Sequence, residues 1–365
     1  MNCGQGCASA RCGRTGDMDE YLLTGSWFGG TRREDYKSKA MHTNPSLSGA
    51  RSLRSETAFY DYARNVGEAQ TDFLQTDHGR TSWSVGQRRL GTTVLQFAAV
   101  GAGTIAAGLM RQPDKLIFLM QSSPAQHCIY LNGTMLPAHA ITVLAPGADF
   151  IFANLLPLEW LSFSVGLDRL PPRLIDRLSE PIAPRTAALL VSQEACFAEL
   201  IDVAARAARL HSTMGSRRSV LEPVDGEGEL IDALTAAVEA SEPDRSARKQ
   251  GDRSNYETIV HLALAGIHDE GIVPVADLCQ AIGIAERTLQ RAFNRIFRMS
   301  PRRYLKLLQL NQVHAAFCAA ESRGQLVTDI LTRHGVTELG RFASEYRALF
   351  GELPSQTIRS GRYFS

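Results

Sequence analysis

Five polar side chains near residue 290 have the types and the spacing that read the edges of DNA bases. They recur at helical intervals between Glu286 and Phe297, with apolar residues at the positions between them. The polar set is Arg287, Gln290, Arg291, Asn294 and Arg295. On a helix these five share one side and the apolar residues share the other. Arginine matches guanine, and glutamine or asparagine matches adenine, in the major groove, so the pattern predicts a helix that reads base pairs.

A shorter helix and a tight turn must position this reading helix. Pro274 suits the first position of a helix, and the apolar residues after it form one stripe. That stripe consists of Val275, Leu278, Cys279 and Ile282. Gly283 then favours the left-handed conformation that ends a helix. The segment Val273–Phe297 is therefore predicted to be a helix-turn-helix unit, with its second helix beginning near Ala285.

The charge around this unit favours a nucleic-acid partner. From Ala285 to Lys306, Glu286 is the only acidic residue. The basic residues of this segment are Arg287, Arg291, Arg295, Arg298, Arg302, Arg303 and Lys306. A basic helix face by itself is most often solvated surface, and that alternative stays open. Because it coincides with a helix-turn-helix pattern, the excess of basic residues indicates a DNA-binding surface that includes Arg302 and Arg303.

A second, less basic copy of the same device spans Val327–Phe350, with its turn at Gly335. The polar side of its second helix carries Thr337, Arg341 and Ser344. This face should therefore contribute less specific readout. One helix, over about Pro301–Ala320, is expected to join the copies. It would be about 30 Å long, close to the ~34 Å turn of DNA, so it could present two helices to adjacent major grooves.

Several spaced motifs in this part of the chain resemble the AraC/XylS family of bacterial transcription regulators. The likeness covers about Tyr256 to Arg359. Its motifs, in the family's order, are Glu286–Phe293, Ser300–Leu305, Val327–Ile330, Gly340–Gly351 and Pro354–Ser355. The segment Leu310–Val313 looks closest to the branch that includes the ethanolamine-operon regulator.

The resemblance implies seven helices with two helix-turn-helix units. It also implies binding to double-stranded promoter DNA and, usually, activation of a nearby promoter, with RNA polymerase as a partner. Carried over by position, the first unit would contact bases through Arg287, Gln290 and Arg291. The second unit would approach bases or phosphates through Thr337, Arg341 and Ser344. Pro301 would begin the connecting helix, with Ser300 as its cap.

Four positions depart from the family's pattern. Ala285 stands where the family usually has a serine cap, and Arg298 stands where it usually has glycine. Gln309 replaces a common arginine, and Val336 replaces a common phenylalanine. A residue with a Cβ at position 298 predicts a strained or differently shaped helix end.

Residues 51–170 have a different pattern, in which short apolar runs alternate with turn signals. The runs are Thr93–Val100, Lys115–Met120, Cys128–Leu131, Ile141–Ala145 and Trp160–Val165. Asn132-Gly133 and Pro146-Gly147 are two of the turns. This spacing predicts a β-sandwich or barrel. The chain is thus predicted to be an α+β protein, with a β-rich, barrel-like sensor domain followed by an all-α domain with two helix-turn-helix units.

In regulators of this family, a barrel ahead of the DNA-binding unit often senses a small molecule or mediates dimerisation. Tyr130–Gly133 and Ala145–Gly147 are similar to the sensor region of the same branch. The residues expected to line an effector pocket are Phe118, His127, Tyr130, Asn132, Glu159 and Trp160. For Phe118, Tyr130 and Trp160, plain core packing is the competing interpretation.

The remaining segments are assigned by composition. Residues 1–50 have no apolar period and predict a disordered tail. Residues 171–240 predict a helical extension, whose Ala-rich helix over Arg185–Leu210 could form a homodimer. Residues 241–254 are polar and predict a linker to the DNA-binding domain, residues 255–365.

Composition excludes several classes of protein. Net charge is +1, with 44% hydrophobic and 21% charged residues, as in ordinary globular domains. The longest apolar run, Ile141–Val165, is broken by prolines and acidic residues, so no membrane span is expected. The start of the chain lacks the apolar stretch of a signal peptide, and the seven cysteines have irregular spacing. Both features predict a cytoplasmic protein with free thiols.

An enzyme is the competing class. Neither a phosphate-binding G-x-x-x-x-G-K-[ST] loop nor a G-x-S-x-G elbow occurs. His127, His139 and Glu159 lack the spacing of a metal-binding barrel. We therefore expect no catalytic residue, cofactor or metal. A DNA-repair or other enzyme fused to an AraC-type domain is the alternative, and its one support is the trio Cys3, Cys7 and Cys12.

Overall fold

The computed structural model describes residues 51–53, 70–79, 83–122, 129–179, 187–209, 226–243, 251–319 and 326–360. The predicted tail of residues 1–50, with its three cysteines, lies outside the described residues. The same is true of His127 and of residues 244–250 within the predicted linker.

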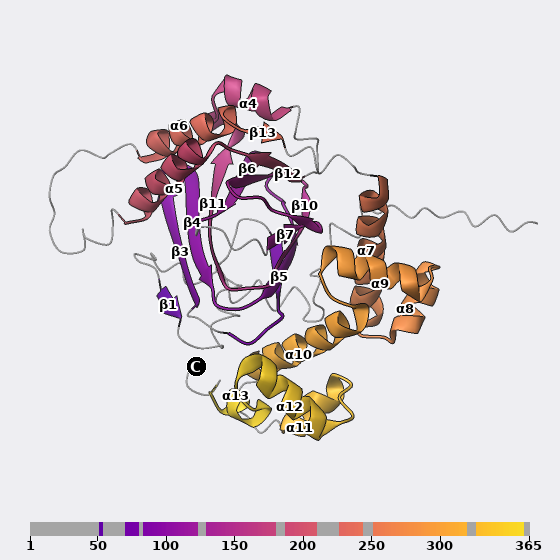
Figure 1. The fold of residues 1–365 in the computed structure, drawn as a ribbon. Coiled ribbons are helices and arrows are strands. Elements are labelled where there is room, and N and C mark those ends of the chain that lie inside the picture. Colours follow the sequence, from indigo (N-terminus) through magenta and orange to yellow (C-terminus); the bar gives the residue numbers. More distant parts are fainter. Residues whose placement is uncertain are drawn as a thin grey trace, which may run out of the picture.

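Two antiparallel sheets form the N-terminal half of the molecule (Figure 1). In spatial order, the larger sheet consists of β1 (Arg51–Leu53), β3 (Trp83–Leu90), β4 (Thr93–Val100), β11 (Leu158–Gly166), β6 (Lys115–Gln121), β9 (Ala140–Leu144), β12 (Ala187–Val191) and β13 (Glu242–Pro243). The smaller sheet consists of β2 (Gln70–Gln75), β5 (Thr104–Leu109), β10 (Asp149–Asn154), β7 (Ile129–Leu131) and β8 (Thr134–Met135). The β-rich domain predicted from the sequence is therefore present as two facing sheets that do not close into one barrel.

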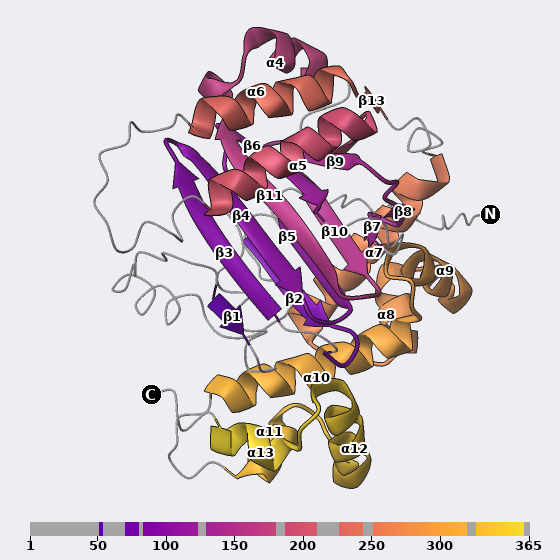
Figure 2. The same cartoon turned by 60° about the vertical axis from the view of Figure 1, so that its left-hand side comes forward.

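A layer of helices covers the outer face of the larger sheet (Figure 2). After the short turn η1 (Leu167–Arg169), this layer contains α4 (Pro172–Ser179), α5 (Glu194–Arg209) and α6 (Gly226–Glu239). Leu200 and Val203 of α5 and Leu230 and Leu234 of α6 are buried in one core with the sheet residue Phe163. The apolar stripes of these helices are thus used inside the molecule.

One detail of the predicted helical extension is wrong. The Ala-rich helix was expected to start at Arg185, but Ala187–Val191 forms strand β12, and the helix starts at Glu194. Strand β12 pairs with β9 over five residues, from Ala187 opposite Leu144 to Val191 opposite Ala140. A short apolar run is compatible with both the helical and the strand period, and here its pairing with β9 stabilises the strand.

The C-terminal part is helical, as predicted. Its described helices are α7 (Gly251–Glu270), α8 (Val275–Ile282), α9 (Glu286–Ile296), α10 (Pro301–Ala319), α11 (Val327–Arg333), α12 (Leu339–Phe350) and α13 (Pro354–Ser360). Gly283 ends α8 with φ of 69°, and its N–H donates to backbone carbonyls of that helix. Among the described residues, no helix combines the length and apolar character needed to cross a membrane.

The helical part and the smaller sheet share a continuous core. Leu74, Ile105 and Ile151 of the sheet are buried in the same cluster as Val260 of α7 and Leu308 of α10. Polar contacts add to this packing, because the backbone N–H of Gln75 donates to Asn311 Oδ1 at 3.0 Å, and Asn311 Nδ2 donates to the Gln75 carbonyl at 3.0 Å. Strand β2 therefore lies directly against α10 (Figure 2).

Candidate nucleic-acid interface

Helix α9 has one buried and one exposed side, as the sequence pattern predicts. Leu289, Ala292, Phe293 and Ile296 are buried. Arg287, Gln290, Arg291 and Asn294 are exposed, and Arg295 is half-buried. The structure thus places the first predicted DNA-binding set on one solvent-facing surface, here called the α9 face. Among the described residues, neither Arg287 nor Arg291 forms an ion pair, so both guanidinium groups remain available to a ligand.

Aromatic packing fixes α9 against the connector α10. The Phe293 and Phe297 ring centroids lie 5.2 Å apart, and those of Phe297 and Tyr304 lie 4.6 Å apart. Tyr304 is fully buried, and burial, together with the charge of Asp72, raises the pKa of its hydroxyl. A reading helix anchored by three mutually packed aromatic rings cannot rotate freely, so the direction of the α9 face is set by the core.

Two more of the predicted arginines lie beside the α9 face. Arg302 and Arg303 are exposed in the first turn of α10, which begins at Pro301. The Arg303 N–H donates to Ser300 Oγ at 3.4 Å, a weak version of the serine cap that the sequence predicts. Exposed cations in the first turn of a helix suit contact with phosphate oxygens.

The second helix-turn-helix unit presents a different electrostatic surface. Thr337, Arg341 and Ser344 are exposed, as expected for a reading surface. However, Arg341 lies 3.0 Å from Glu345 and 3.6 Å from Glu338, and Ser344 Oγ donates to a backbone carbonyl of its own helix at 3.1 Å. This surface is therefore largely neutralised.

Glu345 is the centre of this neutral cluster. Its second carboxylate oxygen lies 2.6 Å from Lys306 Nζ on α10. Burial acts to raise the pKa of Glu345, but hydrogen bonds from Lys306 and Arg341 outweigh burial and hold the pKa below its ordinary value. The carboxylate is thus charged at neutral pH and occupies two cations that could otherwise face DNA.

A buried polar cluster holds the second unit on α10. His314 Nδ1 lies 2.6 Å from the Tyr346 hydroxyl, and the His314 ring stacks on Phe350 with centroids 4.1 Å apart. The Tyr346 hydroxyl lies 2.8 Å from Thr357 Oγ1 on α13. Both units are thus attached to the two ends of one helix, and this fixes the separation of their reading helices.

Two of the predicted effector residues lie at the contact between the domains. Tyr130 is on β7, and the Arg298 guanidinium lies 4.6 Å above its ring. Arg298 has φ of 59°, the left-handed conformation implied by its replacement of a family glycine. Asn132 and Gly133 form the turn after β7, and a Cβ on Gly133 would lie 2.6 Å from the carbonyl oxygen of Arg295. The hairpin β7–β8 therefore rests on the C-terminal end of α9.

The structure does not bring the predicted effector residues together. Phe118 is fully buried in the core between the larger sheet and its helices, where it stacks on Phe163. Glu159 is exposed on β11, and Trp160, its neighbour, lines a cavity between the two sheets. Gln96, Asn154 and Ser162 also line that cavity and were missed. Alternate residues of a strand face the same side of a sheet, so these three could be found from the sequence only once the pairing of the strands is known.

Comparison with known proteins places the helical part in a family. Residues 278–360 match the family model described as a helix-turn-helix domain. The probable thc operon regulatory protein of Rhodococcus erythropolis is 30% identical over 129 residues, 35% of this chain and 39% of that protein. The XylDLEGF operon transcriptional activator of Pseudomonas putida is 32% identical over 82 residues, 22% of this chain and 26% of that protein.

A solved structure, of a probable AraC family transcriptional regulator from Rhodopseudomonas palustris, is 28% identical and is aligned with a TM-score of 0.25. It covers 29% of this chain and 98% of that one. The chain spans less than half the length of the two curated relatives described above. Residues 278–360 therefore form a helix-turn-helix domain, and it is of the AraC/XylS type. The narrower likeness to the ethanolamine-operon branch stays a prediction.

Proposed function

We propose that this protein is a sequence-specific transcriptional regulator. Its two helix-turn-helix units would read adjacent major grooves of a promoter site of about 20 base pairs, under control of the N-terminal domain. The observation that carries the proposal is the α9 face. This face holds exposed arginine and amide side chains that have no carboxylate partner in the described part of the chain, on a helix fixed by buried aromatic rings.

The two units would contribute unequally. The α9 face would supply base readout, with Arg302 and Arg303 on adjacent phosphates. The second surface, with Thr337, Arg341 and Ser344, would mainly position the protein, because Glu345 and Glu338 already pair with Arg341. Neutralised side chains release fewer counterions, so they add less to affinity.

The partners follow from this role. Promoter DNA is the ligand of the helical domain, and RNA polymerase would be the partner if the protein activates transcription, as the names of its curated relatives suggest. A homodimer would pair half-sites on the DNA, and a regulator of this kind would act in the cytoplasm. The competing proposal, an enzyme joined to an AraC-type domain, depends on Cys3, Cys7 and Cys12, which lie outside the described residues.

A salt-series binding titration tests the proposal. The full chain would be titrated against duplexes from the region upstream of its own gene, at several salt concentrations between about 50 and 200 mM. We expect one duplex to be strongly preferred, and we expect log affinity to fall linearly with log salt. The full chain is needed because the core of the helical domain includes residues of the sheet.

Two variants make the test specific. Arg287→Ala removes a cation from the α9 face and should reduce both affinity and preference. Arg173→Ala removes an exposed cation, paired with Glu239 at 3.2 Å, from α4 on the far side of the β domain, and should change neither. Binding without any sequence preference would contradict a sequence-specific regulator and indicate an architectural role. No binding to any duplex would reopen the enzyme proposal.

A further inference from the structure

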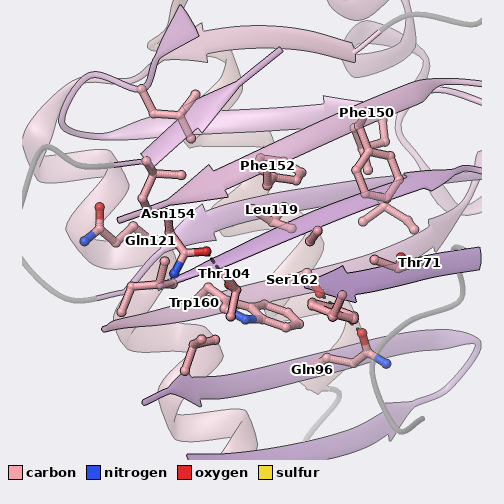
Figure 3. A pocket seen from close by; sticks show the side chains of 18 residues that line it. Thr71, Gln96, Thr104, Leu119, Gln121, Phe150, Phe152, Asn154, Trp160 and Ser162 are labelled. Atoms are coloured by element: carbon pink, nitrogen blue, oxygen red, sulfur yellow. Dashed lines mark hydrogen bonds between the residues drawn. The ribbon is translucent and has the colours of Figure 1, made fainter. Parts of the chain in front are cut away.

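A cavity of about 100 Å³ lies between the two sheets (Figure 3). Its walls come from β4, β6, β9 and β11 of the larger sheet and from β2, β5, β7 and β10 of the smaller one. Phe150 and Phe152 of the smaller sheet form one side of it, and Leu119 and Trp160 of the larger sheet form the other (Figure 3). This cavity is separate from the α9 face and belongs wholly to the N-terminal domain.

The lining of the cavity selects against charge. Twelve of the eighteen lining residues are apolar, and the set contains no Asp, Glu, Lys, Arg or His. An ionised ligand would lose its hydration there and find no counter-charge, which costs several kcal/mol. A carboxylate, a phosphate or an ammonium group is therefore a poor fit for this cavity.

Several polar groups of the lining gather at two ends, and at one end the Asn154 amide is already satisfied. Figure 3 shows Asn154 and Thr104 on one side of Trp160, and Ser162 and Gln96 on the other. Asn154 Nδ2 donates to two backbone carbonyls at 3.2 and 3.1 Å, and its Oδ1 accepts from Thr104 Oγ1 at 2.5 Å. The hydrogen-bonding capacity of the Asn154 amide is thus largely used within the protein.

The opposite end retains hydrogen-bonding capacity. Gln96 and Ser162 are 7% and 5% exposed, so both are almost completely buried. Their side chains make one hydrogen bond, from Ser162 Oγ to Gln96 Oε1, at a long 3.5 Å. Among the described residues, no further side-chain hydrogen bond of this pair is present. Buried amides and hydroxyls normally find partners, so a ligand group would be stabilised here.

We propose that this cavity binds a small, neutral, mainly apolar molecule through one hydrogen-bonding group held by Gln96 and Ser162. An amide, a hydroxyl or a carbonyl group suits this pair, because the glutamine amide can both donate and accept. A ligand of no more than about one ring suits the volume, because a somewhat larger engineered apolar cavity in another protein, of about 150 Å³, holds benzene. Trp160 and Phe152 would enclose the ring, as aromatic walls do in many small-molecule sites.

The position of the cavity gives this ligand a route to the DNA-binding domain. Successive residues of the smaller sheet point to opposite sides. Thr104 and Ala106 of β5 line the cavity, whereas Ile105 and Ala107 lie in the core shared with the helices. A ligand that moves this sheet therefore acts on the surface that docks α7 and α10. This consequence, unlike the binding itself, rests on the proposed regulatory function.

Three single-ring probes test the ligand class, by ligand-observed NMR titration of the full chain at neutral pH. Benzamide and benzoate have nearly the same shape and differ in charge, and toluene lacks a hydrogen-bonding group. We expect benzamide to bind at least about tenfold more tightly than benzoate, since an unpaired charge is excluded. Gln96→Leu should weaken benzamide by about tenfold, the value of one buried hydrogen bond, and leave toluene nearly unchanged.

Two further variants locate the binding. Ala106→Leu extends a lining side chain into the cavity, and it should abolish binding of both benzamide and toluene. Gln193→Leu makes the same substitution at an exposed glutamine just before α5, which does not line the cavity, and it should change nothing. Circular dichroism would confirm that each variant is folded. If Gln96→Leu does not fold, Ala106→Leu still tests whether the probes bind in the cavity.

Several results would overturn the proposal. Benzoate binding as tightly as benzamide would contradict a neutral ligand class. Binding that survives Ala106→Leu would place the probes outside the cavity, and no saturable binding of any probe at millimolar concentration would remove the site. A chain that bound benzamide as expected but bound no DNA would refute the proposed regulatory function alone.

Discussion

Arg291 and Arg303 are both exposed and cationic, yet we expect different effects on DNA binding when each is removed. Arg291 is on the α9 face, where it would contact bases, so Arg291→Ala should weaken binding to the preferred sequence by about 1–3 kcal/mol. Arg303 would contact phosphate, so Arg303→Ala should weaken all sequences alike and reduce the salt slope by about one. Fluorescence anisotropy titrations with preferred and scrambled duplexes measure both quantities.

The orientation proposed for α9 depends on this contrast. If Arg291→Ala left affinity and sequence preference unchanged, α9 would not read bases with this face. If the two variants had the same effect on every duplex, the surface would bind phosphate only.

Glu345 is expected to limit the DNA affinity of the second unit. Its carboxylate binds Arg341 and Lys306 at 3.0 and 2.6 Å. Glu345→Gln should release both cations toward DNA, raise affinity for all duplexes and steepen the salt dependence. The same titrations measure the change, and Glu352→Gln, a carboxylate that contacts Thr357 and no cation among the described residues, is the control. Unchanged affinity in Glu345→Gln would mean that this face does not approach DNA.

Because His314 is buried, we expect the stability of the fold to depend on pH. Burial lowers its pKa to about 3, whereas an unfolded histidine titrates near 6.5. Below pH ~6.5 the unfolded chain therefore binds a proton that the folded chain excludes, and stability falls by up to about 1.4 kcal/mol per pH unit. Denaturant unfolding at about pH 7.5, 6 and 5 should show this loss.

The matched variant is His314→Gln, which retains a hydrogen-bonding group near Tyr346 but does not titrate in this range. The pKa of His261 is shifted in the opposite direction. Burial acts to lower its pKa, but Asp149 and Glu257 raise it above the ordinary value, so His261 stabilises the fold as pH falls. Comparing the wild-type chain with His314→Gln cancels this contribution. Equal pH slopes in the two proteins would contradict a neutral, buried His314.

Residue types alone predicted the α9 face but not the cavity. The exposure of each polar residue of α9 could be predicted from the helical period, because the helix is amphipathic and its apolar residues are buried on one side. The cavity depends on which strands face each other, a long-range property that no local pattern contains. Tyr130 illustrates the difference, because it was expected in a pocket and instead stacks under Arg298 at the domain contact.

At the scale of elements, the turn of the hairpin β7–β8 contacts the C-terminal end of the reading helix α9. Gly133→Ala should disturb this contact, because Gly133 has φ of 74° and a Cβ would lie 2.6 Å from the Arg295 carbonyl oxygen. We expect a loss of stability of about 1–3 kcal/mol and faster hydrogen exchange at the C-terminal end of α9. Mass spectrometry of exchanged peptides from residues 286–300 measures the second effect.

Gly147→Ala is the control, since Gly147 also has a positive φ of 75° and lies in a turn of the same domain. It should cost similar stability without a selective effect on α9. Equal exchange at α9 in both variants would show that the hairpin does not support the reading helix.

The elements also show where the sequence pattern is ambiguous. Long amphipathic helices such as α9 and α12 were predicted because their apolar period is unmistakable. The run Ala187–Val191 was assigned to a helix, although its pairing with β9 makes it a strand. A run of four or five apolar residues is compatible with both the helical and the strand period, and only the sheet edge beside it favours the strand.

At the scale of the whole molecule, the smaller sheet is shared between the cavity and the DNA-binding domain. Its outward residues Leu74, Ile105 and Ile151 are buried with α7 and α10 residues in one cluster. A shared core predicts that the sheet and the helices lose structure together, because neither can expose this surface without cost. The chain should therefore show one unfolding transition for both parts.

Leu74→Ala tests this shared core against a matched substitution. Leu74 and Leu95 are both fully buried strand residues, but Leu74 faces the helical domain and Leu95 faces the helical layer of the larger sheet. Each truncation should cost about 2–5 kcal/mol. In native-state hydrogen exchange, Leu74→Ala should lower protection in β2, α7 and α10 together, whereas Leu95→Ala should act first on β4, α5 and α6. If Leu74→Ala loosened β2 and left α7 and α10 fully protected, the domains would be energetically independent, and a ligand between the sheets would have no mechanical route to the α9 face.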